Sequence, residues 1–138
     1  MITTAEALAQ AVAYHRAGHL SRAEYVYRQI LEADPNHAEA WHLLGLLAHQ
    51  LGQHELAVEF IGRAIQLNPG GPACYNNLGL AQQALQKLDD AVASYQRALE
   101  LNPDYAVAHN NLGNARKEQR RPEDAAGAQG SFVFIPEP

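Results

Sequence analysis

Residues 66–79 read QLNPGGPACYNNLG, and residues 100–113 read ELNPDYAVAHNNLG. The two stretches align without a gap at an offset of 34 residues. Both contain an Asn-Pro step, then a ring-bearing residue (Tyr75 or His109), then Asn-Asn-Leu-Gly. A related stretch, EADPNHAEAW, occupies residues 32–41, one period earlier. A fixed period of this length is typical of stacked supersecondary units.

Several residue types keep the same register along the chain. They are Pro35, Pro69 and Pro103; Gly45, Gly79 and Gly113, each after a leucine; and Ala23, Ala57, Ala91 and Ala125. Within a unit the spacing is helical, first at Tyr75, Leu78, Gly79 and Gln82, then at Ala91, Tyr95, Ala98 and Leu99. The segment QKLDD between the two sets places acidic residues where a helix begins. Each unit is therefore predicted to be a helix–turn–helix, here termed the A helix and the B helix.

Composition limits the classes of function that fit this chain. Its 138 residues are 47% hydrophobic and 18% charged, which predicts a folded domain rather than a disordered one. A formal net charge of −5 does not favour binding to nucleic acid or to an anionic membrane. The single cysteine, Cys74, excludes an intramolecular disulfide. We find no signal peptide pattern, and the longest apolar run, LLGLLA at 43–48, is too short to span a bilayer; we expect a cytoplasmic protein.

The pattern resembles the tetratricopeptide repeat (TPR) family. The resemblance lies in WHLLG at 41–45 and YNNLG at 75–79, each followed by the register alanines and a proline. It implies an all-α, right-handed superhelical solenoid of about three and a half repeats. The expected divisions are a divergent first repeat at 4–37, repeats at 38–71 and 72–105, a partial capping repeat at 106–129 and a non-helical tail at 130–138.

The paired asparagines are unusual inside helices, because their amides compete for backbone hydrogen bonds. If Tyr75, Leu78, Gly79 and Gln82 form the buried stripe, Asn76 and Asn77 point to the opposite side. In the TPR family this side forms a concave groove that binds peptide segments. The chain is also similar to the repeat arrays of protein O-linked N-acetylglucosamine transferases, whose groove asparagines hold the substrate backbone; the matching residues are Asn77 and Asn111. The alternative is that these amides bond to one another or to neighbouring turns.

The resulting candidate peptide-binding residues lie on the predicted groove side of three A helices. They are His42, Leu46, His49, Asn76, Asn77, Leu80, Asn110, Asn111, Asn114 and Lys117. A related groove in the family uses Lys and Arg to clamp a C-terminal carboxylate. The corresponding residues here, Leu8, Val12, Leu43, Ala73 and Asn77, are not basic, so we do not expect a carboxylate clamp.

The sequence contains no pattern that points to catalysis, a cofactor or a metal site. The segment NPGGP lacks the lysine of a phosphate-binding loop, and His42 and His49 are too far apart along one helix to share an ion. We therefore expect a non-catalytic scaffold that binds a protein or peptide in its groove. Two alternatives stay open: a substrate-presenting segment of a larger glycosyltransferase, and a self-assembling module. In the second, the broken fourth repeat would leave a stacking face that another copy of the chain covers. Separately, Phe132 and Phe134 of the tail could insert into a groove of the same chain or of a neighbour.

Overall fold

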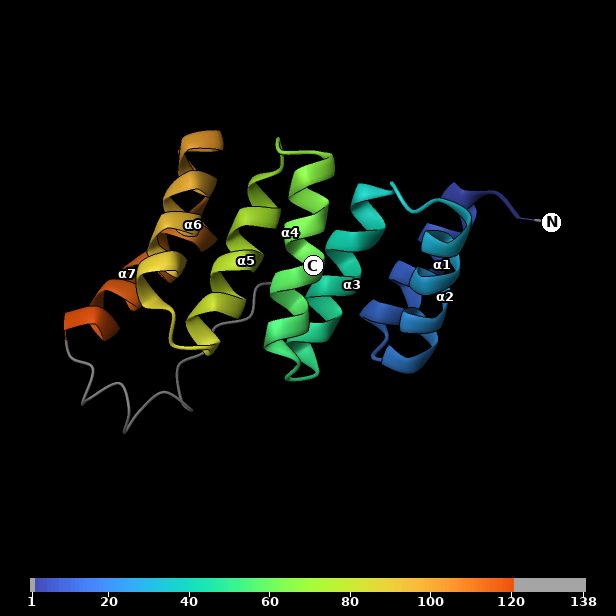
Figure 1. The fold of residues 1–138 in the computed structure, drawn as a ribbon, viewed down its shortest axis with the longest axis horizontal. Helices are drawn as coiled ribbons and strands as arrows, with labels where there is room; N and C mark the ends of the chain where they lie inside the picture. The colour runs from blue at the N-terminus through green and yellow to red at the C-terminus, as the bar shows by residue number, and fades with distance from the viewer. Residues whose placement is uncertain (1, 121–138) are drawn as a thin grey trace. The chain divides into compact units, whose positions relative to one another are not determined.

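The computed structural model describes residues 2–120, and all its regular elements in this range are α-helices (Figure 1). The helices are α1 (Thr4–Arg16), α2 (Leu20–Ala33), α3 (Ala38–Gln50), α4 (His54–Leu67), α5 (Pro72–Ala84), α6 (Leu88–Leu101) and α7 (Ala106–Arg120). The odd-numbered helices are the predicted A helices, and the even-numbered ones are B helices. The predicted second helix of the fourth repeat and the tail lie outside the described residues.

The chain divides between Pro69 and Gly70 into two compact units. In the first unit α1 packs on α2, α2 on α3, and α3 on α4. In the second unit α5 packs on both α6 and α7, and α6 packs on α7. The predicted all-α helix–turn–helix architecture is confirmed for the described residues.

Each turn from an A helix to its B helix contains one residue with a left-handed backbone. These residues are Gly18 (φ 83°), Gly52 (φ 80°) and Gln86 (φ 61°), again at intervals of 34. Glycine adopts this conformation without steric cost, whereas the Cβ of Gln86 makes it less favourable. The chain direction thus reverses at the same repeat position in all three repeats.

The turns between repeats are held by a ring on the following A helix. Trp41 donates its indole N–H to the carbonyl oxygen of Pro35 at 2.7 Å. His109, two repeats later, contacts the carbonyl oxygen of Pro103 through Nε2 at 2.7 Å, so this nitrogen is the protonated one. Different rings therefore make the same bond to the proline turn.

Small residues allow the A and B helices of a repeat to approach closely. Ala23, Ala57 and Ala91 are fully buried. A Cβ added at Gly79 would lie 2.5 Å from Cε1 of Tyr95, and one added at Gly45 would lie 2.5 Å from Cγ1 of Ile61. These contacts explain the glycine after each register leucine in the second and third repeats.

The buried stripe predicted for α5 is only partly correct. Gly79 is buried, but Tyr75, Leu78 and Gln82 are half-buried. The face assigned to the groove is covered more completely, since Asn76 and Leu80 are 0% and 3% exposed. The reason is that within its unit α5 packs against both α6 and α7, and contact with α7 covers the side that a single stripe leaves open.

Candidate binding face

The second unit brings seven of the ten predicted residues onto α5 and α7, which pack together. Asn76, Asn77, Leu80 and Asn111 are buried, and Asn114 is half-buried, whereas Asn110 and Lys117 are exposed; Asn76, Asn77 and Leu80 come from α5 and the others from α7. We call the five asparagines of this set the amide face. The structure thus places amides from two consecutive A helices on packed neighbours, and their role in binding stays a prediction.

Two asparagines of the amide face form a direct bond between α5 and α7. Asn111 donates from Nδ2 to Oδ1 of Asn76 at 3.0 Å, and Asn76 and Asn111 are 0% and 2% exposed. The prediction that all the asparagines lie on the groove rather than in the core is wrong for this pair. Here the alternative left open by the sequence, an amide bonded to an amide, is what the structure shows.

The Asn76 amide is only half satisfied by this bond. Its Nδ2 is buried and has no hydrogen-bond partner among the described residues. A buried polar atom without a partner costs about 1–3 kcal/mol. Asn76 therefore holds an unused donor inside the α5–α7 contact.

A second polar bond joins the same two helices. Gln83 donates from Nε2 to Oε1 of Glu118 at 2.7 Å, and Tyr95 on α6 donates its hydroxyl to Oε1 of Gln83 at 2.7 Å. Burial, together with Glu118, raises the pKa of Tyr95, which keeps its hydroxyl protonated. Sequence analysis missed Gln83 and Glu118, although their separation of 35 residues equals that of Asn76 and Asn111.

The three candidates on α3 belong to the first unit. Leu46 and His49 are 2% and 3% exposed, and His42 is half-buried. Burial lowers the pKa of His42 to about 4. Burial and the neighbouring His54 lower the pKa of His49 to about 4 as well. Both imidazoles are therefore uncharged at neutral pH.

His49 forms a close pair with His54 at the start of α4. Their Nδ1 atoms are 2.9 Å apart and their ring centroids are 4.8 Å apart. For a hydrogen bond between the two Nδ1 atoms, one must carry a proton and donate it, and the other must be unprotonated and accept it. Nε2 of His49 is buried and has no partner within the described part of the chain.

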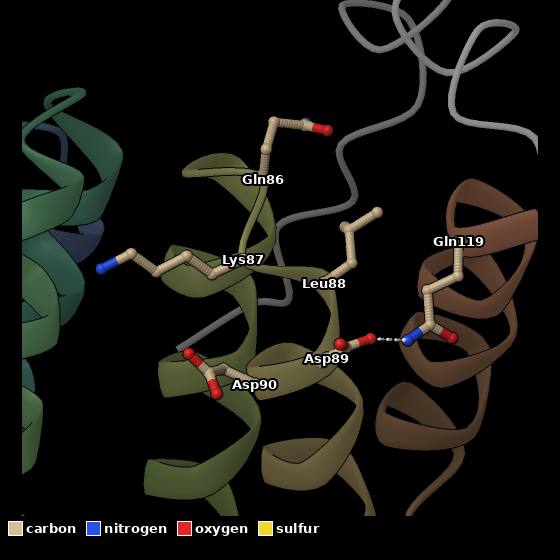
Figure 2. A pocket seen from close by; sticks show the side chains of 6 residues that line it. All are labelled: Gln86, Lys87, Leu88, Asp89, Asp90 and Gln119. Carbon is tan, nitrogen blue, oxygen red and sulfur yellow. Dashed lines mark hydrogen bonds between the residues drawn. The ribbon is translucent and has the colours of Figure 1, made fainter.

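A shallow pocket of about 470 Å³ lies between the α5–α6 turn and the end of α7 (Figure 2). It is lined by Gln86, Lys87, Leu88, Asp89, Asp90 and Gln119. Figure 2 shows the side chains of Asp89 and Gln119 meeting across the gap, and Gln119 donates to Asp89 at 2.7 Å. The pocket is lined mainly by polar and charged groups, and it contains none of the predicted binding residues.

The described residues contain neither a metal-binding cluster nor a membrane-spanning helix. Across residues 2–120, no three His, Cys, Asp or Glu side chains come together as a metal-binding group would require. None of the helices in this range is both long enough and apolar enough to cross a membrane.

Family models identify the repeats. A model described as "Tetratricopeptide repeat" matches residues 8–72, and one described as "TPR repeat" matches residues 83–119. The chain belongs to the tetratricopeptide repeat family. Its described part is accordingly an all-α TPR solenoid, as the sequence predicts. No curated protein sequence is significantly similar to the chain.

Several solved TPR structures are similar to this one. The first TPR of Spaghetti (RPAP3), bound to the HSP90 peptide SRMEEVD, has 26% identity and a TM-score of 0.82; the match covers 85% of this chain and 93% of that one. The Thermobaculum terrenum O-GlcNAc transferase has 34% identity and a TM-score of 0.79, over 83% of this chain but 23% of that protein. MamA has 27% identity and a TM-score of 0.74, over 86% and 69%.

The amide pair of this TPR unit gives an asymmetric prediction for stability. Asn111→Ala leaves the buried Asn76 amide with no partner, so we expect it to destabilise the unit by about 2 kcal/mol. Asn76→Ala should cost less, because it also removes the unpaired Nδ2 donor. The double variant should cost less than the sum of the single variants, by about 1 kcal/mol. Urea unfolding of the four proteins tests this, and additive effects of equal size would contradict it.

Proposed function

We propose that the protein is a non-catalytic scaffold that binds an extended segment of another protein along its A helices. The observation that carries this proposal is the amide face, where five asparagines gather on two packed A helices. Asparagine inside a helix is unfavourable by about half a kcal/mol relative to better helix formers. An amide offers both a donor and an acceptor, which match the carbonyl and N–H groups of a peptide backbone.

The similarity to the RPAP3 repeat supports peptide binding but not the same peptide. That domain is bound to SRMEEVD, an acidic peptide. In this chain the positions where the family places its basic clamp hold Leu8, Val12, Leu43, Ala73 and Asn77. An acidic peptide would gain no charge-assisted hydrogen bonds from these side chains. We therefore propose a ligand recognised mainly through its neutral backbone.

Binding can be tested with peptides selected from a random library displayed on phage, using the whole chain as bait. We expect Asn110→Ala combined with Asn114→Ala, the exposed and half-buried members of the amide face, to weaken a selected peptide by about tenfold in calorimetry, because one or two hydrogen bonds to the peptide would be lost. Asn36→Ala, an exposed asparagine in the turn before α3, is the matched control and should leave affinity unchanged. Synthetic SRMEEVD should not bind more tightly than the millimolar range.

Two results would overturn the proposal. One is a selected peptide whose affinity is the same for the double variant and for the control, provided that both proteins remain folded. The other is tight binding of SRMEEVD that disappears at high salt, which would reveal a charged clamp.

A second candidate function follows from the similarity to the Thermobaculum terrenum enzyme. We propose as an alternative that the chain presents a protein substrate to a glycosyltransferase, in the way a repeat segment of a longer enzyme could. The chain covers 23% of that protein, so the match does not extend to most of its length. Affinity capture of a glycosyltransferase from the native cell extract, lost in the Asn110→Ala, Asn114→Ala variant, would favour this alternative.

A further inference from the structure

The same three-residue hydrogen-bond chain occurs once in each unit. In the first unit Oη of Tyr27 lies 2.9 Å from Nδ1 of His15, and Nε2 of His15 lies 2.6 Å from Oε1 of Gln50. In the second unit Tyr95 is bonded to Gln83, which is bonded to Glu118. Each member of the second chain follows its counterpart by 68 residues, which is two repeats.

Each chain starts on a B helix, passes through the A helix of the same repeat and ends on the next A helix. The first runs from α2 through α1 to α3, and the second runs from α6 through α5 to α7. Both tyrosines are fully buried, and His15 is 5% exposed. Hydrogen bonds in such surroundings have little competition from water, and an unpaired member would be costly.

The direction of donation is fixed in the second unit. Oε1 of Glu118 accepts from Nε2 of Gln83, so the amino group of Gln83 faces Glu118. The carbonyl oxygen of Gln83 then faces Tyr95, which must donate. If the first unit works in the same way, Tyr27 donates to an unprotonated Nδ1 of His15, and the protonated Nε2 donates to Gln50.

We propose that these two chains, which we call relays, are positioning elements that fix the spacing between consecutive A helices. His15 acts there as its Nε2–H tautomer, the role that the Gln83 amide fills in the second unit. The second relay lies two helical turns along α5 and α7 from the Asn76–Asn111 bond, so these helices are joined at two levels. The consequence for ligand binding rests on the proposed function, because α5 and α7 carry the amide face.

The second repeat shows what happens when the tyrosine is missing. Ile61 occupies the position of Tyr27 and Tyr95, and it has no hydroxyl group. His49, which corresponds to His15 and Gln83, bonds to His54 instead and leaves its Nε2 buried without a partner among the described residues. A histidine or glutamine at this position alone therefore does not produce a relay.

Two measurements test the proposal: the tautomer of His15, and the stability of variants in which His15 is replaced. Nitrogen-15 NMR of the whole chain near neutral pH should show His15 protonated at Nε2 and not at Nδ1. His15→Gln should preserve the relay, with the unfolding equilibrium constant changing by less than about threefold. His15→Leu should raise this constant by about tenfold or more, and Tyr27→Phe should act in the same direction. His19→Leu, at an exposed histidine of the same unit, is the control and should have little effect.

The outcomes separate the relay from the proposed function. A protonated Nδ1 on His15, or equal stability of the Gln and Leu variants, would overturn the relay. If Gln83→Leu also weakens a phage-selected peptide, while Gln83→His keeps its affinity, positioning of the amide face is supported. If the tautomer and the stabilities are as expected but no peptide binds the unmodified chain, the relay stands and the proposed function fails.

Discussion

Gly79→Ala is expected to destabilise the second unit by about 3 kcal/mol, which is the upper end of the usual cost of overpacking. The added Cβ would lie 2.5 Å from Cε1, 2.8 Å from Cδ1 and 2.9 Å from Cζ of Tyr95. The Tyr95 ring is fully buried and its hydroxyl is held by Gln83, so it has little freedom to move aside. The α5–α6 hairpin must therefore separate to admit one methyl group.

Gly45→Ala should have a comparable effect in the first unit. Its Cβ would lie 2.5 Å from Cγ1 of Ile61 and 3.1 Å from the backbone nitrogen of the same residue. Rotation of the Ile61 side chain could relieve the first contact but not the second. We expect the loss of stability to be close to that of Gly79→Ala.

Gly62→Ala is the matched control for both substitutions. Gly62 lies inside α4, and no heavy atom among the described residues comes within 4 Å of the position of its added Cβ. Alanine there should stabilise the helix by about 0.5–1 kcal/mol, because glycine is the poorer helix former. Urea unfolding followed by circular dichroism compares the three variants, and hydrogen exchange locates the weakened helices. Equal stability of Gly79→Ala and Gly62→Ala would show that the close approach at Gly79 is not required.

The repeat pattern was sufficient to predict the helices, because it reports the packing inside one repeat. Gly45 and Gly79 lie 34 residues apart because α3 and α5 each meet the B helix of the same repeat in the same way. The turns were predictable for a similar reason, since Gly18 and Gly52 supply a backbone conformation that most residues avoid. Local geometry of this kind can be predicted from a single sequence, because the same residue type is needed at the same position of each repeat.

The sequence left open whether amides of successive A helices bond to one another, and the 34-residue pattern did not identify the partners because these bonds follow a different offset. Asn76 meets Asn111, and Gln83 meets Glu118, each at a separation of 35 residues rather than 34. A helical wheel drawn for one helix assigns one buried side and treats the rest as exposed. In a stack, each inner A helix has a further neighbour, so polar residues on the second side become buried and bond to one another.

The predicted binding residues therefore separate into two groups. Asn76 and Asn111 bond to each other in the contact between α5 and α7 and stabilise it. A peptide ligand would have to compete with this bond for the same amide groups. Asn110 and Lys117 are exposed and available for contact without any rearrangement. The sequence places both groups on one helical side, and only the packing of α7 on α5 distinguishes them.

Lowering the pH from about 7 to about 5 is expected to destabilise the first unit. His49 and His42 should each contribute a loss of about 2 kcal/mol in the free energy of unfolding. In the folded chain the pKa of each is lowered from 6.5 to about 4. The unfolded chain, with pKa values near the ordinary 6.5, binds protons that the folded chain excludes over this range. Stability is therefore full above about pH 6.5 and falls as the pH drops toward about 4.

His49→Gln provides the decisive comparison, because glutamine occupies the corresponding position, Gln83, in the third repeat. This variant should lose about half of the pH dependence, and His42→Gln should lose a similar share. His19→Gln, at an exposed histidine, should leave the dependence unchanged. Urea unfolding at a series of pH values above about 5 avoids most of the titration of ordinary carboxylates. Stability that does not vary over this range, or varies equally in all three variants, would show that His42 and His49 are not held neutral by burial in the folded chain.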